Sequence, residues 1–207
     1  VAIDRVCWQG EAVAAVVAES RRQAEDALEC IEVEWELLPV VSDMRQALEA
    51  NTVIHPELGD NICFHRELKT EGFDAAWAAA DVVVEKTYRF GRHTGVCNEP
   101  RAILADYNPA DHSLTVYHAT QAPNMMQDIF SRHLDIPESN IRVICKDVGG
   151  SFGIKVHVYA DEMATAALSV MLRRPVKFQA DRAESFLTDI HAREHEATVR
   201  DRKSTRL

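Results

Sequence analysis

The sequence has no long apolar run and no cluster of basic residues. Its apolar runs fall far short of the roughly 20 residues that span a bilayer, which argues against a membrane-spanning helix in these 207 residues. The 23 basic residues are scattered and outnumbered by 33 acidic ones, giving a net charge of −10. We therefore expect neither a nucleic-acid partner nor an anionic membrane surface as partner.

Cysteine pairs at metal-binding spacing are also lacking. The chain has an odd number of widely spaced cysteines and no C-x-x-C pair: Cys7, Cys30, Cys63, Cys97 and Cys145. This spacing disfavours a disulfide framework and a zinc or iron–sulfur site in this chain. Reduced thiols favour a cytoplasmic location, while export of an assembled complex stays open.

Both ends of the chain lack features of a natural terminus. The chain starts at Val1 rather than Met and shows no secretory signal pattern, so we expect its true beginning to lie upstream. Residues 201–207 (DRKSTRL) continue no earlier pattern and correspond to GAT CGG AAG AGC ACA CGT CTG, which looks like a sequencing-library adapter. They are predicted to be a non-native tail.

Residues 1–50 contain a strand, helix, strand pattern. The continuous apolar run at residues 12–18 is typical of a buried strand, and the alternation at residues 32–37 predicts a second one. Between them, Ser20 and Gln23 predict a capping box at the start of a helix. These elements predict a compact, right-handed βαβ unit, followed by a linker at residues 51–71, where periodicity is lost.

Residues 72–200 predict a second region of mixed helices and strands. Helices are expected at residues 73–80, from Pro123, through residues 163–172 and around residues 183–187. Strands are expected at residues 82–90, 102–107, 114–118, 141–145, 176–179 and near 197–199. The turn residues at 108–112 predict a hairpin. The predicted fold class is mixed α/β and α+β.

Three of the eight glycines gather in DVGGSFGIK, residues 147–155. A strand, a glycine-rich turn and a helix place free N–H groups and the positive end of a helix dipole together, as in sites for anionic oxygens. The loop is not a P-loop, because Val156 follows Lys155 where Ser or Thr is required. For the loop alone, a turn with no ligand is an equally good interpretation.

Gln121, in the stretch TQAP, lies at a second strand-to-helix junction, 31 positions before Phe152. Two such junctions in one sheet can face the same crevice at the carboxyl ends of the strands, where ligands tend to bind. Taken alone, a glutamine at such a junction is more often a local capping or turn residue.

Three stretches resemble the molybdenum-binding large subunit of the xanthine dehydrogenase and aldehyde oxidase family, the molybdenum hydroxylases: ATQAPNMMQDIFSRHLDIPESNIRV, DVGGSFGIK and RRPVKFQADRAESF. The stretches QGEAVAAVVAES and AEDALECIEVEWELLPVV are similar to the hammerhead-like α/β domain that precedes it. The resemblance implies an internal fragment. Residues 1–50 would be the C-terminal part of the hammerhead-like domain, 51–71 the linker, and 72–200 the first part of the molybdopterin-binding α+β domain.

The resemblance implies cofactor-binding residues at the two junctions. Gln121 would direct its amide toward the apical oxo group of molybdenum, as a neutral donor. Gly150, Ser151, Phe152 and Gly153 would lie against the pterin and metal, with the N–H groups of Phe152 and Gly153 as donors. Ser151 stands where the family commonly has glycine. The pterin dithiolene and non-protein ligands would hold the metal, so no residue here is expected to be a metal ligand.

Two further positions bear on the substrate. Val156 stands where purine-hydroxylating members have a glutamate, so purines should be poor substrates. Glu99, together with His93 and Arg101, would either line a substrate funnel or belong to a hydrogen-bonded pair that fixes the loop. The glutamate that serves as catalytic base in the family lies downstream, so no catalytic residue is expected in this chain, and the fragment alone would be inactive.

The resemblance implies an oxidoreductase that hydroxylates an aldehyde or N-heterocycle with oxygen from water; a carbon monoxide dehydrogenase large subunit is the alternative within the family. The implied cofactors are a molybdenum-pterin cofactor in its dinucleotide form, with FAD and [2Fe-2S] centres on partner subunits or domains. The implied assembly is a dimer of heterotrimers. Outside the family, the alternative is a non-catalytic α/β binding or assembly module with an anion-binding glycine loop.

Overall fold

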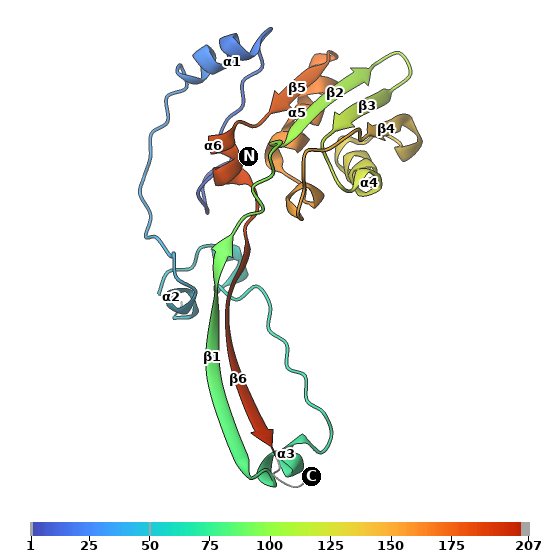
Figure 1. The fold of residues 1–207 in the computed structure, drawn as a ribbon. Coiled ribbons are helices and arrows are strands. Elements are labelled where there is room, and N and C mark those ends of the chain that lie inside the picture. Colours follow the sequence, from blue (N-terminus) through green and yellow to red (C-terminus); the bar gives the residue numbers. More distant parts are fainter. Residues whose placement is uncertain (1, 50, 204–207) are drawn as a thin grey trace. The chain divides into compact units, whose positions relative to one another are not determined.

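A computed structural model describes residues 2–49 and 51–203 (Figure 1). The described residues divide into two units. The first unit comprises residues 2–33 and 93–192, and the second comprises residues 34–49, 51–92 and 193–203. Val1 and Ala50 of the predicted N-terminal region, and residues 204–207 of the predicted tail, lie outside the described residues.

The first unit is built on a four-stranded sheet with the strand order β4-β3-β2-β5. Its strands are β2 (Ala102–Asn108), β3 (Ser113–His118), β4 (Ile141–Ile144) and β5 (Val176–Gln179). The predicted hairpin is confirmed, because β2 and β3 pair antiparallel, with Ile103 opposite His118 and Asn108 opposite Ser113. β4 joins β3 in parallel, and β5 joins β2 antiparallel.

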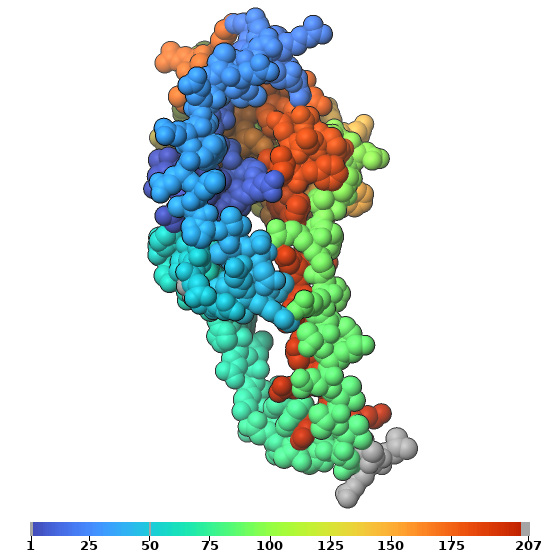
Figure 2. All heavy atoms as spheres, turned by 90° about the vertical axis from the view of Figure 1, so that its left-hand side faces the viewer, coloured from blue at the N-terminus to red at the C-terminus, as the bar shows by residue number. Residues whose placement is uncertain are grey.

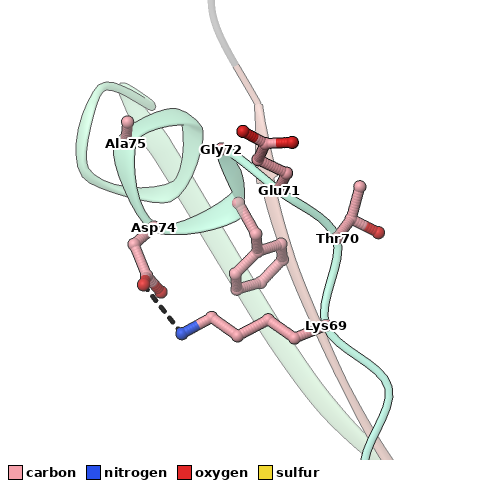
Figure 3. Close-up of a pocket in the computed structure, with 7 residues that line it drawn as sticks. Lys69, Thr70, Glu71, Gly72, Asp74 and Ala75 are labelled. Carbon is pink, nitrogen blue, oxygen red and sulfur yellow. Dashed lines mark ion pairs between the residues drawn. The ribbon is translucent and has the colours of Figure 1, made fainter.

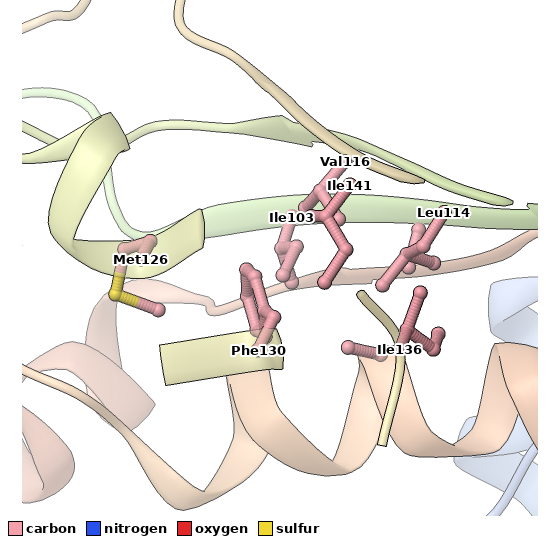
Figure 4. Packing of buried hydrophobic residues seen from close by; sticks show 9 residues of the cluster. Ile103, Leu114, Val116, Met126, Phe130, Ile136 and Ile141 are labelled. Atoms are coloured by element: carbon pink, nitrogen blue, oxygen red, sulfur yellow. The ribbon is translucent and has the colours of Figure 1, made fainter. Parts of the chain in front are cut away.

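Two helices cover one face of this sheet, and the core lies between them and the strands (Figure 4). They are α4 (Pro123–Leu134), which begins at Pro123 as predicted, and α5 (Ala160–Leu172). Met126 and Phe130 of α4 and Ala166 of α5 are fully buried against alternate residues of the strands. Alternation along β2 and β3 therefore points one row of side chains into the core. The core residues are Ile103, Ala105, Leu114, Val116, Met126, Phe130, Ile136, Ile141 and Ala166.

The N-terminal βαβ prediction is only partly correct. Helix α1 (Arg21–Leu28) forms, and the Ser20 side chain accepts from the backbone N–H of Gln23, as expected of its N-cap. Residues 12–18 and 32–37 form no strand, and their apolar side chains are largely exposed, so the predicted parallel pairing is wrong. The apolar pattern indicated side chains suited to a sheet, but a strand forms only where a neighbouring strand accepts its backbone hydrogen bonds.

Helix α6 (Arg182–Thr188) follows β5 and lies beside the N-terminal segment in the first unit. Figure 2 shows these orange-red residues next to the blue N-terminal chain, where Gly10 comes so close to the Leu187 carbonyl that a Cβ at Gly10 would lie 2.2 Å from its oxygen. The helix starts with a complete capping box. Asp181 accepts from the backbone N–H of Glu184 at 2.7 Å, and Glu184 accepts from that of Asp181 at 2.7 Å.

We expect Asp181→Ala to lower the free energy of unfolding by about 1 kcal/mol, because it leaves N–H groups of the first turn of α6 without an acceptor. Asp181→Asn is the matched control, since asparagine is an equally good N-cap residue. Thermal unfolding of the complete protein measures both variants. Equal midpoints of thermal unfolding for Asp181→Ala and the wild type would show that the capping box contributes nothing to stability.

The second unit contains a two-stranded sheet and short helices. Strands β1 (Val82–His93) and β6 (Ala192–Lys203) run in opposite directions (Figure 1). Arg45 and Arg89 both pair with Glu196 on β6, each at 2.7 Å. The helices are α2 (Met44–Leu48), η1 (Pro56–Leu58) and α3 (Phe73–Ala78). β6 is longer than predicted and includes residues 201–203 of the predicted tail.

The second unit also holds a hollow formed by one short segment. It is lined by residues 69–75, and Figure 3 shows Lys69 paired across it with Asp74, at 2.7 Å. None of the predicted site residues lies there. Within residues 2–49 and 51–203, every helix is too short or too polar to cross a bilayer.

Candidate functional site

The sheet of the first unit brings the two predicted junctions to one edge. β3 and β4 are parallel neighbours, and their last paired residues are Tyr117 and Ile144. The chain leaves β3 into residues 119–122 and leaves β4 into residues 145–153. Because the carboxyl ends of adjacent parallel strands lie at the same edge of a sheet, these two segments meet there.

The junction after β3 is fixed by Thr120. Its hydroxyl is buried, donates to the Lys155 carbonyl at 3.0 Å and accepts from the Ala122 backbone N–H at 3.1 Å. The Gln121 backbone N–H also donates to the Lys155 carbonyl, at 3.1 Å. With its backbone held on both sides, Gln121 presents an exposed carboxamide at the start of α4.

The glycine loop after β4 is a compact turn. Gly150 and Gly153 have φ values of 99° and 92°, in the left-handed region that favours glycine, and Phe152 between them has φ 49°. The turn closes with a bond of 2.9 Å from the Ile154 N–H to the Ser151 carbonyl. Within the described part of the chain, nothing accepts from the backbone N–H groups of Ser151, Phe152 or Gly153. Three successive free donors of this kind suit an anionic or oxygen-rich ligand.

The helix predicted through residues 163–172 is confirmed as α5, but it does not begin at the glycines, so the expected helix dipole at the loop is wrong. A single 3-10 turn, η3 (Ile154–Val156), follows the glycines, and α5 begins only at Ala160. Lys155 has φ −84° and ψ 17°, which breaks the helical path. Its side chain turns inward to an ion pair with Glu99 at 2.8 Å. The donors of the loop are therefore its own N–H groups, without the dipole of a long helix.

Side chains also join the two segments. The Ser151 hydroxyl donates a short hydrogen bond to the Gln121 carbonyl oxygen Oε1. This contact turns the Gln121 amide nitrogen Nε2 away from Ser151, and Nε2 has no hydrogen-bond partner within residues 2–49 and 51–203. The serine that stands in place of the family's glycine thus fits the loop and orients the carboxamide.

Phe152 is 78% exposed, although it is a large apolar side chain. Its Cβ approaches Gly95, where an added Cβ would lie 2.9 Å from the Phe152 Cβ. At Gly149, a Cβ would lie 2.5 Å from the Glu99 Cβ. Both glycines are therefore needed for the loop to lie this close to residues 95–99, while Phe152 and Gly153 stay exposed.

Glu99 forms the hydrogen-bonded pair that was one of its two predicted roles. Its carboxylate pairs with Lys155 at 2.8 Å and accepts from the Gly149 N–H at 2.7 Å. The hydrogen bond from Lys155, and next that from Gly149, hold the pKa of Glu99 below its ordinary value. Lys155 is a buried residue that the sequence analysis missed as part of the site. Val156 follows it in η3, half-buried, and its predicted position in the substrate pocket stays a prediction.

Arg101 is completely buried and does not line a funnel. Its guanidinium pairs with Asp161 at 2.6 Å, Asp189 at 2.7 Å and Glu162 at 3.3 Å, and lies 3.7 Å from the centre of the Tyr159 ring. Burial would lower the pKa of Arg101, but these carboxylates raise it above its ordinary value. Burial raises the pKa of Tyr159 to about 12. We call these five residues the Arg101 cluster.

No metal-ligand cluster stands out. His191, Arg193 and His195 alternate along the sequence at a spacing that resembles a set of metal ligands, but all three are exposed. In residues 2–49 and 51–203, no group of three or more His, Cys, Asp or Glu side chains is arranged to hold a metal ion. A metal at this edge would need ligands from a cofactor, and the free N–H groups and carboxamide are suited to such a cofactor.

Comparisons with known proteins give consistent results for sequence and structure. The profile of the molybdopterin cofactor-binding domain matches residues 54–201. The chain is 37% identical over 196 residues to the nicotine 6-hydroxylase large subunit of Paenarthrobacter nicotinovorans, covering 95% of this chain and 24% of that protein. It is 32% identical over 206 residues to the carbon monoxide dehydrogenase large chain of Hydrogenophaga pseudoflava, covering 93% and 26%.

The structure is similar to that of quinoline 2-oxidoreductase from Pseudomonas putida 86, with a TM-score of 0.81 and 32% sequence identity. That match covers 90% of this chain and 24% of the other. The chain thus spans about a quarter of the length of the relatives it matches.

Proposed function

The chain belongs to the molybdopterin cofactor-binding domain family of the molybdenum hydroxylase large subunits, and from this premise we propose that it forms one wall of the cofactor site in an oxidoreductase. The single observation that carries the proposal is the meeting of the Gln121 carboxamide with three free backbone N–H groups at residues 151–153. All are neutral donors, as a cofactor rich in oxygen and negative charge requires.

Each donor has a distinct place in the proposal. Gln121 would direct its Nε2 toward the metal centre of the cofactor, and the Ser151 hydroxyl, which donates to Oε1, would hold the carboxamide in that orientation. The N–H groups of Phe152 and Gly153 would donate to the cofactor, with Gly150 beside them, and the open space where a Cβ of Gly153 would lie leaves room for its approach. When bound, the molybdenum-pterin cofactor would supply the oxygen-transfer and redox chemistry, while these residues bind and orient it.

The proposed reaction converts a substrate C–H group and water into C–OH, two protons and two electrons. The electrons pass to FAD and [2Fe-2S] centres on partner subunits or domains, within a dimer of heterotrimers in the cytoplasm. The pterin is proposed to be in its dinucleotide form. The catalytic base is a glutamate of the family that lies outside this chain, so the domain binds and orients rather than transfers the proton.

An N-heterocycle or an aldehyde is the proposed substrate class. Val156 offers no polar group to the edge of a purine, so purines are expected to be poor substrates. Glu99 is proposed to border the pocket through its partly exposed side chain, 39% of which is accessible. Two relatives are named for nicotine and quinoline, which are N-heterocycles. Because another relative is named as a carbon monoxide dehydrogenase, carbon monoxide is the alternative substrate.

Elemental analysis of the complete, purified protein tests the proposal. We expect one molybdenum per large subunit, released together with a pterin on denaturation. A protein that carries neither, purified from cells that produce the cofactor, would contradict the proposal and favour the alternative of a non-catalytic module that binds anions through its glycine loop. Xanthine and a panel of N-heterocycles and aldehydes, assayed on the molybdenum-loaded protein, test the substrate class.

A further inference from the structure

The ion pair between Lys155 and Glu99 adjoins the glycine loop, because Glu99 also accepts from the Gly149 N–H. Only 1% of the Lys155 side chain is exposed, whereas 39% of the Glu99 side chain is exposed. A lysine is almost never buried this deeply without a partner, because an unpaired ammonium loses its hydration. Glu99 is the only carboxylate within ion-pair distance of Lys155 in the part of the chain that the structure describes.

Glu99 holds the first end of the glycine loop. Its Oε2 accepts from Lys155 Nζ at 2.8 Å and from the Gly149 N–H at 2.7 Å. Its own backbone N–H donates to the Gly149 carbonyl at 3.1 Å. The absence of a side chain on Gly149 makes this approach possible, since a Cβ there would collide with the Glu99 Cβ at 2.5 Å.

Lys155 holds the other end of the loop through its backbone. Its carbonyl accepts from the Thr120 hydroxyl at 3.0 Å and from the Gln121 N–H at 3.1 Å. One residue therefore connects the junction that carries Gln121, through its carbonyl, with the start of the loop, through its side chain and Glu99.

Between these two ends, the loop has few contacts of its own. The Ser151 carbonyl closes the turn, but the N–H groups of Ser151, Phe152 and Gly153 have no acceptor in residues 2–49 and 51–203. Their positions thus depend on the two held ends, Gly149 and Lys155, and on Ser151, whose carbonyl also accepts from the Cys97 thiol at 3.3 Å and whose hydroxyl donates to Gln121. We infer that the buried Lys155–Glu99 pair sets the distance between the backbone donors of the glycine loop and the Gln121 carboxamide, which makes Lys155 and Glu99 positioning residues of the site. The inference rests on the proposed function only for the identity of the ligand that the backbone donors bind.

The two residues should respond differently to substitution. Glu99→Gln keeps the shape but leaves the Lys155 ammonium buried without a counter-ion, which is the costlier loss. Lys155→Met removes the buried charge and leaves Glu99 partly solvated, still able to accept from Gly149. The double variant Glu99→Gln/Lys155→Met has no buried unpaired charge. It should therefore be closer to the wild type than Glu99→Gln is, a coupling that two independent sites would not show.

Amide hydrogen exchange of the complete, cofactor-free large subunit in its complex gives a readout that does not depend on activity. In Glu99→Gln, we expect exchange of the hydrogen-bonded amides of Gly149 and Ile154 to be about 10- to 100-fold faster, as for loss of a charge-assisted hydrogen bond. Exchange in β2 and β3 should be unchanged. The control is Ile136→Ala, a core substitution at a 1% exposed side chain away from the loop. It should lower stability without selective exchange at residues 149–154.

The molybdenum-loaded complex gives a second readout. In Glu99→Gln, kcat per molybdenum should fall at least tenfold while KM changes by no more than about twofold, since the donors face the cofactor rather than the substrate. Wild-type exchange at the Gly149 and Ile154 amides in both Glu99→Gln and Lys155→Met would overturn the inference. A wild-type complex without molybdenum would contradict the proposed function instead, and the exchange result would still decide the role of the pair.

Discussion

Replacing Arg101 with methionine is expected to lower the free energy of unfolding by about 3–5 kcal/mol, the largest effect on stability that we predict for a single substitution. The Arg101 side chain is fully buried, and it neutralises a set of carboxylates from two other parts of the chain. Without it, Asp161, Glu162 and Asp189 would face one another in a site with little water. Methionine fills a similar volume but can neither donate a hydrogen bond nor balance their charge.

The effect should also reach the glycine loop. The guanidinium lies on the face of the Tyr159 ring, and the Tyr159 hydroxyl donates to the Ile154 carbonyl at 2.8 Å. Ile154 directly follows the loop. Loss of Arg101 is therefore expected to loosen Tyr159 and, with it, the turn that closes the loop.

Thermal and denaturant unfolding of the complete protein measure this effect. Arg132→Met is the matched control, since Arg132 pairs with Asp128 on the surface of α4 and its side chain is 72% exposed. That variant should unfold close to the wild type, as exposed pairs contribute little. Arg101→Lys should be intermediate, because one ammonium cannot replace the fork of a guanidinium. Equal stability of Arg101→Met and Arg132→Met would refute the role of the cluster.

The parts of the fold that the sequence predicts well are those determined by neighbouring residues. Turn residues at 108–112 fix the β2–β3 hairpin, Pro123 starts α4, and Asp181 with Glu184 starts α6. In each case, the residues that predict the element lie within a few positions of it in the sequence. The family resemblance is confirmed by the profile match to residues 54–201, whereas the predicted boundaries at residues 50 and 71 stay predictions.

The missed parts depend on residues far apart in the sequence. The apolar run at residues 12–18 looks like a strand, yet no strand pairs with it. Lys155 looks like a solvated loop residue, because its partner Glu99 lies 56 positions earlier. The helix predicted through residues 163–172 forms as α5, but η3 separates it from the glycines. Local sequence could place Gln121 and Phe152 at junctions, but only the parallel pairing of β3 with β4 brings those junctions together.

Replacing Gln121 with alanine is expected to lower kcat roughly 10- to 1000-fold in the molybdenum-loaded complete enzyme, by analogy with the loss of one donor to a developing charge. The backbone at this position is held by the Lys155 carbonyl, so the substitution removes the carboxamide without moving the chain. Molybdenum content should be unchanged, because the backbone donors of the glycine loop remain. Steady-state kinetics, normalised to molybdenum, measure the effect.

A second glutamine on the same helix provides the control that separates chemistry from stability. Gln127 donates from Nε2 to the carbonyls of Glu138 and Ile141, both at 3.0 Å, and so ties α4 to the segment before β4. Gln127→Ala should lower thermal stability and leave kcat per molybdenum near that of the wild type. Gln121→Ala should lower kcat per molybdenum and leave thermal stability near that of the wild type. Because Ser151 orients the Gln121 carboxamide, Ser151→Ala should lower kcat less than Gln121→Ala does. Full turnover in Gln121→Ala, with normal molybdenum content, would remove the role that we assign to this side chain.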